Sequence, residues 1–292
     1  MTSYSKPDFI CIGFEKAATT WLYKHLNNHP EVKLPYIKEF RYFSEGDDLP
    51  AYTLKNRFFG DHWHYGIYRD HVKRFIRDYV RHPRSTEGRS WWFKYLFYPR
   101  TEEWYSNLFD TEMVSGDITP TYTHLSEKSV ERIKASFPNT KIILILREPT
   151  SRLWSKLKMN VGRQTQRELS EIEDWEIDRM IDIHFKTEPF LSDVVERWRR
   201  HFKDIEIVFF EDVHEKPTEV MYRIFKLLNC SILPLDSAVL KSKVHLGLDG
   251  DMPLRIRKRY IERHSTDVER LSQLTDSDYP NRWLAKYREY QS

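Results

Sequence analysis

The chain has few cysteines, no long apolar run and little net charge, and each of these scarcities excludes a class of protein. Its two cysteines, Cys11 and Cys230, are too few for a disulfide framework and favour a reducing compartment, so we expect a cytoplasmic protein. No apolar run approaches the ~18 residues that cross a bilayer, and the run at residues 9–12 is too short for a secretory signal. A net charge of +3 is too small to indicate nucleic-acid binding.

Aromatic residues, in contrast, are abundant and supply the apolar surface that a folded core needs. Charged residues make up 31% of the chain and the mean hydropathy is -0.68, but 17 Phe, 17 Tyr and 9 Trp offset this polarity. A chain of 292 residues can form one α/β domain with insertions. We therefore predict a single domain over residues 1–292.

Apolar, β-branched runs alternate with helical patterns along much of the chain. The runs lie at residues 9–12, 113–115, 142–146 and 205–210. Ser126 is a suitable N-cap for a helix that ends before Pro138, and Pro217 suits the first turn of another helix. The alternation predicts an α/β protein with a central parallel sheet covered by helices.

Residues 13–21, with the sequence GFEKAATTW, follow the first strand and open a helix. The first amides of a helix lack internal partners and its dipole favours anions, while Lys16 adds a positive charge and Thr19 and Thr20 add hydroxyl donors. This pattern predicts a phosphate site; a helix start with a surface lysine is the alternative. A Walker A loop needs its lysine directly before Ser or Thr, and Ala17 stands there instead, which argues against ATP or GTP hydrolysis.

A second anion site is indicated after the run at residues 142–146. Arg147, Pro149 and Arg152 follow it, and the helix that begins there contains Ser155. An arginine at the carboxyl end of a strand and a serine eight residues later can converge on one anion above the sheet edge. Guanidinium geometry suits a phosphate. The alternative is a helix-capping turn with a surface arginine, in which Arg152 braces the turn.

The two motifs closely resemble those of sulfotransferases that use 3′-phosphoadenosine 5′-phosphosulfate (PAPS). Lys-x-x-Thr-Thr-Trp, with a glycine three residues before the lysine, is similar to their 5′-phosphosulfate loop, and Leu-Arg-x-Pro-x-x-Arg-x-x-Ser is similar to their 3′-phosphate motif. Residues 38–43, 116–122 and 208–212 resemble further segments of carbohydrate-type and bacterial sulfotransferases. The resemblance implies a three-layer α/β/α, P-loop-like fold and a nucleotide site made by Gly13, Lys16, Ala17, Ala18, Thr19, Thr20, Trp21, Arg147, Ser155, Lys241 and Lys243.

Ala18 departs from the family pattern, which commonly has glycine at this position. If the position requires a positive φ, alanine costs ~1 kcal/mol there. The sequence therefore predicts a loop of slightly different shape.

The resemblance also implies the chemistry, a metal-free transfer of SO3 from PAPS to an acceptor hydroxyl or amine (EC 2.8.2.-). By analogy with phosphoryl transfer, Lys16 would stabilise the departing phosphate. Lys38 would hold the sulfuryl oxygens, and Glu39 would be the general base. An ordinary surface charge pair is the alternative for Lys38 and Glu39. The rival bases are His62, His64 and His124.

The acceptor side of the site is less defined by the sequence. Asp117 is expected to orient Lys38 or the acceptor. Residues 45–110 break the strand and helix alternation and mix aromatic residues with arginines and lysines, so they form either an acceptor wall or a small core of their own. The candidates for the wall are Trp63, Tyr65, Trp91 and Trp92.

Three functions remain open at this level. The first is a sulfotransferase acting on a small-molecule, glycan or lipid acceptor, with residues 241–292 forming a loop and helices at the end of the domain. The second is a P-loop kinase or nucleotidase, and the third is a non-catalytic nucleotide- or glycan-binding module. Lys16 and Glu39 together argue against the third, because binding alone needs no paired cation and base.

Overall fold

The structure, a computed structural model, describes residues 4–44, 54–60, 63–81, 86–164, 167–240 and 250–291. Its centre is a four-stranded sheet with the order β2-β1-β3-β4, in which every neighbouring pair is parallel. The strands are β1 (Phe9–Gly13), β2 (Gly116–Ile118), β3 (Lys141–Leu146) and β4 (Ile205–Phe209). The predicted parallel α/β sheet is thus confirmed.

The second strand lies three residues beyond its predicted place. Residues 113–115 were expected to form it, but Val114 makes only an isolated bridge with Val32, and the strand begins at Gly116. Gly116 allows close packing, because a Cβ there would lie 2.4 Å from the ring of Phe9. Because β2 contains the polar residue Asp117, it lacks the continuous apolar pattern by which the other strands were predicted.

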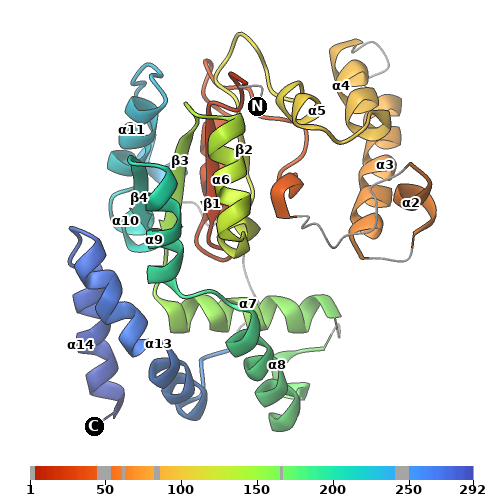
Figure 1. Cartoon of the computed structure of the whole chain (residues 1–292). Helices are drawn as coiled ribbons and strands as arrows, with labels where there is room; N and C mark the ends of the chain where they lie inside the picture. The colour runs from red at the N-terminus through yellow and green to blue at the C-terminus, as the bar shows by residue number, and fades with distance from the viewer. Residues whose placement is uncertain are drawn as a thin grey trace.

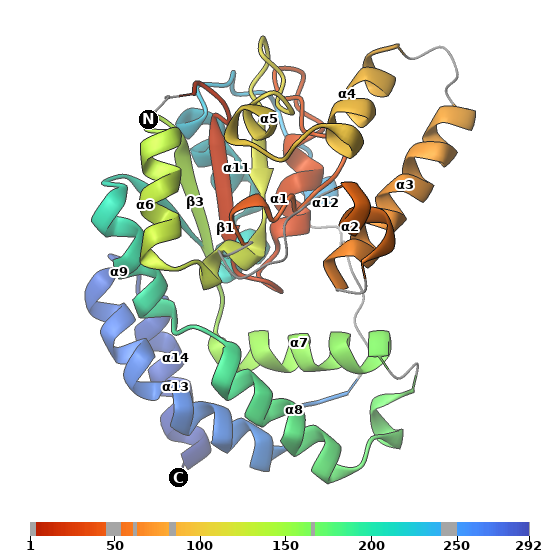
Figure 2. The same cartoon turned by 45° about the vertical axis from the view of Figure 1, so that its right-hand side comes forward.

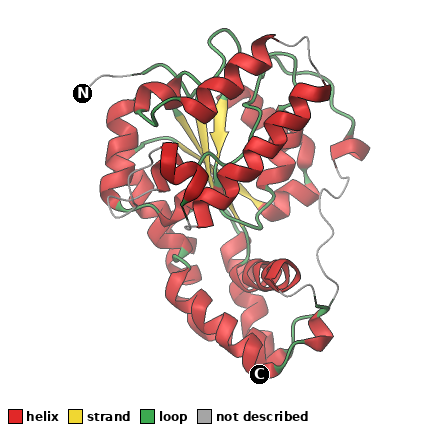
Figure 3. Cartoon of the chain, turned by 90° about the vertical axis from the view of Figure 1, so that its right-hand side faces the viewer, coloured by secondary structure: helices red, strands yellow, loops and turns green. Residues whose placement is uncertain are grey.

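Helices cover both faces of the sheet (Figures 2 and 3). One face carries α1 (Thr19–Leu26), α11 (Pro217–Leu227) and α12 (Ser237–Leu240), and the other carries α6 (Glu127–Ser136) and α9 (Leu191–His201). The predicted helix starts are confirmed: Ser126 Oγ accepts a hydrogen bond from the Ser129 amide, and Pro217 is the first residue of α11. This is the three-layer arrangement that the resemblance implied.

The remaining helices surround this sandwich (Figure 1). Short 3₁₀ helices are η1 (Tyr42–Ser44), η2 (Pro120–His124) and η3 (Leu169–Glu171). Beyond the carboxyl ends of the strands lie α7 (Pro149–Gln164) and α8 (Asp174–Thr187). The last elements are α10 (Phe210–Glu215), α13 (Leu254–Leu274) and α14 (Tyr279–Gln291). None of the described helices combines the length and apolarity needed to cross a membrane.

The described part of the aromatic-rich segment, residues 45–110, forms four helices beside the sheet, namely α2 (Leu54–Phe59), α3 (Trp63–Arg81), α4 (Thr86–Phe97) and α5 (Glu102–Ser106). Its aromatic residues pack mainly against one another. Trp92 and Tyr65 are buried, and Trp91 stacks on Tyr95 and donates a hydrogen bond to the Leu108 carbonyl. The prediction of an acceptor wall is therefore wrong for Trp92 and Tyr65, whose rings are enclosed. The side chain of Trp63 lies outside the described residues.

Candidate active site

The loop between β1 and α1 begins at a glycine that no other residue could replace without strain. Gly13 has a φ of 141°, and a Cβ there would lie 2.5 Å from Thr123 Cγ2 and 2.7 Å from the Pro120 carbonyl oxygen. Further along the loop, Lys16 and Ala18 have φ values of 64° and 70°. The left-handed conformation suspected at Ala18 is thus present. It turns the chain sharply into α1.

Neighbouring elements fix the backbone of this loop. The Phe14 amide donates to the Ile145 carbonyl at 2.8 Å, and Arg147 donates through Nη1 to the Lys16 carbonyl at 2.7 Å. The Lys16 ammonium lies 3.9 Å from the Met159 sulfur on α7. Among the described residues no side chain caps α1, and its first turn contains no acid. The first amides of α1 and the helix dipole therefore suit an anion.

Lys38 links this loop to the candidate base. Its ammonium donates to the Thr19 and Thr20 hydroxyls at 3.2 and 3.3 Å and approaches a Glu39 oxygen at 3.3 Å. The Lys38 and Glu39 side chains are 18% and 28% exposed. The two residues are therefore more than the solvated surface pair considered above, because Lys38 also binds the first turn of α1.

Glu39 is held in a strained, well-supported segment. Both Glu39 and Arg41 have positive φ values, and Arg41 donates to the second Glu39 oxygen at 2.8 Å. Between them, Phe40 is buried among the rings of the aromatic segment, including Tyr105 and Phe109. The aromatic segment thus positions the loop that carries Glu39.

The charges around Glu39 keep it ionised. Burial acts to raise the pKa of Glu39, but the Lys38 and Arg41 cations outweigh burial and lower the pKa below its ordinary value of 4.5. The carboxylate is consequently ready to accept a proton at neutral pH, and its basicity depends on the two cations.

The second predicted anion site is only partly assembled. Arg147 lies with its guanidinium 4.1 Å from the centre of the Phe210 ring, and burial lowers its pKa. Ser155 lies one helical turn before Met159, on the face of α7 that Lys16 approaches. Ser151, rather than Ser155, lines a hollow of about 230 Å³ beside Arg147, together with Glu148 and Glu211. The predicted residues Lys241 and Lys243 lie outside the described residues.

Two predicted residues, Asp117 and Trp21, are buried and hydrogen-bonded within the protein. Asp117 is 1% exposed and accepts hydrogen bonds from the hydroxyls of Tyr105, Thr119 and Tyr122. This setting contradicts a direct contact with the acceptor, and burial raises its pKa. Trp21 is 5% exposed, and its Nε1 donates to the Leu240 carbonyl at 2.8 Å. Its indole therefore ties α1 to α12, just before residues 241–249.

Of the three rival bases, only His124 has a described side chain. His124 is the last residue of η2, and the charges that act on it include Lys156 and Arg152 of α7. Burial is the main cause that lowers the pKa of His124 below 6.5. Sequence reasoning missed Arg41, which holds Glu39, and the pair formed by Glu15 and Lys156, discussed below. The signal in the sequence was Glu15, an acid directly before Lys16, which indicates that another cation must neutralise it for the loop to bind an anion.

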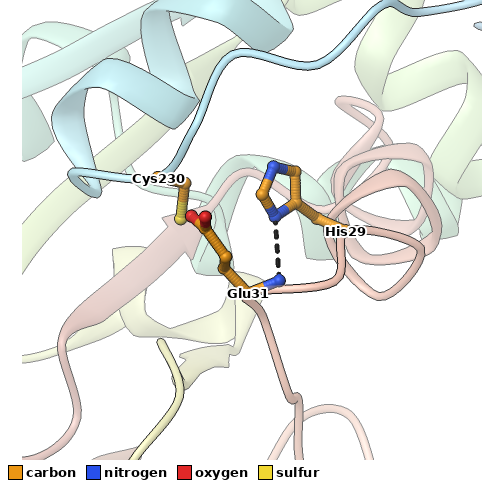
Figure 4. Close-up of side chains that lie close together, drawn as sticks. All are labelled: His29, Glu31 and Cys230. Atoms are coloured by element: carbon orange, nitrogen blue, oxygen red, sulfur yellow. Dashed lines mark hydrogen bonds between the residues drawn. The ribbon is translucent and has the colours of Figure 1, made fainter.

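A separate cluster of His29, Glu31 and Cys230 has the residue types of a metal site, with ligand atoms within 4.8 Å of one another (Figure 4). Hydrogen bonds already occupy most of these atoms. His29 Nδ1 accepts from the Glu31 amide, so Nε2 donates to the Ser231 carbonyl, and both Glu31 oxygens accept from Ser231. Burial raises the pKa of the Cys230 thiol to about 11. The cluster therefore fastens two distant chain segments together.

The chain is similar to known sulfotransferases. A model of the sulfotransferase family matches residues 7–234. Among solved structures, a sulfotransferase from Alicyclobacillus acidocaldarius is similar with a TM-score of 0.62 and 18% identity, covering 96% of this chain and 99% of that chain. A sulfotransferase domain of the Synechococcus PCC 7002 olefin synthase is similar with a TM-score of 0.51 and 14% identity, covering 85% and 86% of the two chains. At such identities these structures show the fold alone. No curated protein matches the chain significantly.

Proposed function

The chain belongs to the sulfotransferase family, and we propose that it transfers a sulfuryl group from PAPS to a hydroxyl or amine of a small-molecule, glycan or lipid acceptor. One observation carries the proposal: the Lys38 ammonium joins the hydroxyls at the start of α1 to the carboxylate of Glu39. An anion site and an ionised base therefore lie on two sides of one cation.

In the proposed reaction the acceptor oxygen forms a bond to sulfur while the bond from sulfur to the bridging phosphate oxygen breaks. Glu39 takes the proton of the acceptor hydroxyl. Negative charge grows on the bridging oxygen, where Lys16 and the amides at the start of α1 stabilise it. In this scheme Lys38 attracts the sulfuryl oxygens during transfer. The product nucleotide is 3′,5′-bisphosphoadenosine (PAP).

We propose that fixed cations serve here in place of the magnesium that a P-loop kinase uses. Lys16 belongs to the loop between β1 and α1, and Lys38 contacts the Thr19 hydroxyl at the end of this loop. Arg147 donates a hydrogen bond to the Lys16 carbonyl and so fixes the loop backbone. We assign the 3′-phosphate to Arg147 and Ser155. Lys241 and Lys243 are proposed to bind the nucleotide from the loop that they begin. Both cysteines are buried and unpaired, which supports a cytoplasmic location.

The test uses purified protein, radiolabelled PAPS and a panel of hydroxyl and amine acceptors. Label should pass to at least one acceptor, and Lys16→Ala should lower kcat by about 10²- to 10³-fold, the usual cost of losing one group that stabilises developing charge. Lys24→Ala, near the other end of α1, is the matched control and should keep the wild-type rate. A wild-type rate in Lys16→Ala would refute the assigned role.

The alternatives give different results in the same experiment. A kinase or nucleotidase would be stabilised against heat by ATP with magnesium and not by metal-free PAP. A binding module would be stabilised by PAP but would transfer no label to any acceptor. Either pattern would overturn the proposal.

A further inference from the structure

The anion-binding loop of this chain contains an acid of its own, Glu15, directly before Lys16. Consecutive Cα atoms lie about 3.8 Å apart, so an unpaired carboxylate here would repel any phosphate that Lys16 attracts. The Glu15 side chain is 23% exposed, and it is not left unpaired. Its carboxylate accepts a hydrogen bond of 2.5 Å from Lys156 on α7.

Lys156 is itself anchored in the protein interior. Its ammonium also donates to Glu188, which is 2% exposed, and Glu188 accepts a second hydrogen bond from the buried Arg152 at 3.0 Å. The Arg152 guanidinium lies 4.7 Å from the centre of the Phe14 ring. Phe14 and Glu15 thus both contact side chains of α7, about two turns and one turn, respectively, before Met159, which Lys16 approaches.

Charge balance gives this arrangement its meaning. Glu15, Glu188, Arg152 and Lys156 carry two negative and two positive charges, so the group is neutral as a whole. The group therefore adds no net charge beside Lys16. Three further titratable groups among the described residues interact electrostatically with members of this group, namely His124 on η2, His184 on α8 and Tyr260 on α13. Without Lys156, the loop would face a net negative charge on its α7 side.

We propose that Lys156 is a positioning residue for the donor nucleotide and acts through Glu15, by neutralising its carboxylate and holding it against α7. This inference rests on the proposed function, since PAPS is taken as the ligand of the loop. It assigns Lys156 no contact with the donor itself.

The experiment measures the Kd of PAP by titration calorimetry for the wild type, Lys156→Met, Glu15→Gln and the double variant. Lys156→Met should bind PAP about tenfold more weakly, since a like charge near the phosphate opposes binding. Glu15→Gln and the double variant should both stay within about threefold of the wild type, because no acid remains to be neutralised. Lys156→Arg should also bind like the wild type.

A purely structural role for Lys156 predicts a different pattern. In that case, or if Lys156 touches the donor, the double variant would bind as weakly as Lys156→Met, and the proposal would be overturned. Salt provides a second readout: the tenfold deficit of Lys156→Met should shrink at about 1 M salt, where the Debye length is ~3 Å. A deficit that salt leaves unchanged would also contradict an effect of charge.

Two further measurements keep the test decisive. If Lys156→Met does not fold, Glu15→Asp replaces it, because a shorter acid loses its reach to Lys156 while keeping its charge. It should bind PAP more weakly than Glu15→Gln, and equal affinities would refute the proposal. Inorganic pyrophosphate is the second ligand. If the wild type binds pyrophosphate but not PAP, the proposed function is wrong while the order of the variants still tests Lys156; binding of neither would overturn both.

Discussion

Ala18 shows how a single backbone conformation records the shape of the anion loop. Its φ of 70° and ψ of 19° place it in the left-handed region, where a side chain costs about 1 kcal/mol or more relative to glycine. The residue before it, Ala17, is fully buried and does not share this conformation. Substitution by glycine should therefore have opposite effects on protein stability at these two adjacent positions.

Ala18→Gly should stabilise the protein slightly, by roughly 0.5 kcal/mol, because relief of strain exceeds the added entropy of the unfolded chain. A gain of this size raises Tm by about 1 °C in a protein of this length. Ala17→Gly is the matched control and should lower stability by about 0.5–1 kcal/mol or more. Scanning calorimetry of both variants checks this. Equal losses in the two variants would exclude the left-handed conformation at Ala18.

Glu39 makes a prediction about pH, since its pKa is lowered by Lys38 and Arg41 against the opposing effect of burial. A base works in its ionised form, so the rate should fall only as pH drops through the lowered pKa. The acid limb of kcat/KM for a hydroxyl acceptor should therefore lie below pH 4.5. Glu39→Gln should lower kcat by about 10²- to 10⁴-fold with the Kd of PAP nearly unchanged.

The competing base leaves a distinct signature. If His124 takes the proton, the acid limb should lie below the ordinary histidine value of 6.5 because burial lowers the pKa of His124, and His124→Ala should be the inactive variant. A steady-state pH profile of both variants separates the two cases. Activity retained in Glu39→Gln would transfer the role away from Glu39.

At the scale of elements, the sequence predicted what depends on local pattern. β1, β3 and β4, the caps at Ser126 and Pro217, and the turn into α1 all follow from periodicity or from short motifs. β2 was displaced because Asp117 looks like a surface residue, whereas three distant hydroxyls satisfy it inside the fold. Burial of a polar group could not be predicted without its partners.

The site followed the same division. The loop residues and Lys38 were found from motifs, but their supports were not, because the partners lie far apart in the sequence. Lys156 is 141 residues from Glu15, and Arg147 is 131 residues from the Lys16 carbonyl that it binds. Trp92 on α4 and Tyr65 on α3 were misjudged for a related reason, since their burial depends on the tertiary fold.

The buried ion group between α7 and the segment before α9 makes a prediction at this scale. Glu188 is 2% exposed between Arg152 and Lys156, and the two cations hold its pKa well below the ordinary 4.5 although burial acts to raise it. Glu188→Gln should cost about 3–5 kcal/mol at pH 7, because two cations would lose their buried partner. Urea unfolding measures this difference.

The same measurement at lower pH tests the cause. Because the folded pKa of Glu188 is lowered, its contribution is present above the unfolded value and is lost as pH falls toward the folded one. The gap between wild type and Glu188→Gln should therefore be largest near pH 7 and smaller at pH 4. Glu127→Gln, whose partners Arg200 and His201 lie on the surface, should change stability little at either pH. A gap independent of pH would rule out the ion group as its source.

At the scale of the whole molecule, the folded structure extends beyond the residues that the family model matches. The match ends at residue 234, yet α13 and α14 pack beside the site. Tyr287 donates to Glu148, the residue after Arg147, and Trp283 donates to Glu211 at 2.8 Å. Asp267 on α13 accepts from the Leu191 and Ser192 amides and so caps α9. The C-terminal helices thus hydrogen-bond to residues at the starts of α7, α9 and α10, all of which lie within the matched region.

Removal of residues 253–292 should therefore abolish cooperative folding. The two helices bury eight apolar side chains, namely Ile256, Tyr260, Ile261, Val268, Leu271, Tyr279, Trp283 and Tyr287. At about 1.5–3 kcal/mol each, their burial contributes about 12–24 kcal/mol, which matches or exceeds the usual ~5–15 kcal/mol of total stability. Near-UV circular dichroism and a thermal scan of the chain ending at residue 252 test this, and a cooperative transition with native-like signal would show that the matched region folds alone.

The Asp267→Ala variant of the full chain tests one contact of α13. It should remain folded but lose about 1–2 kcal/mol of stability, as removal of a helix cap does. A wild-type Tm would show that α13 does not support α9.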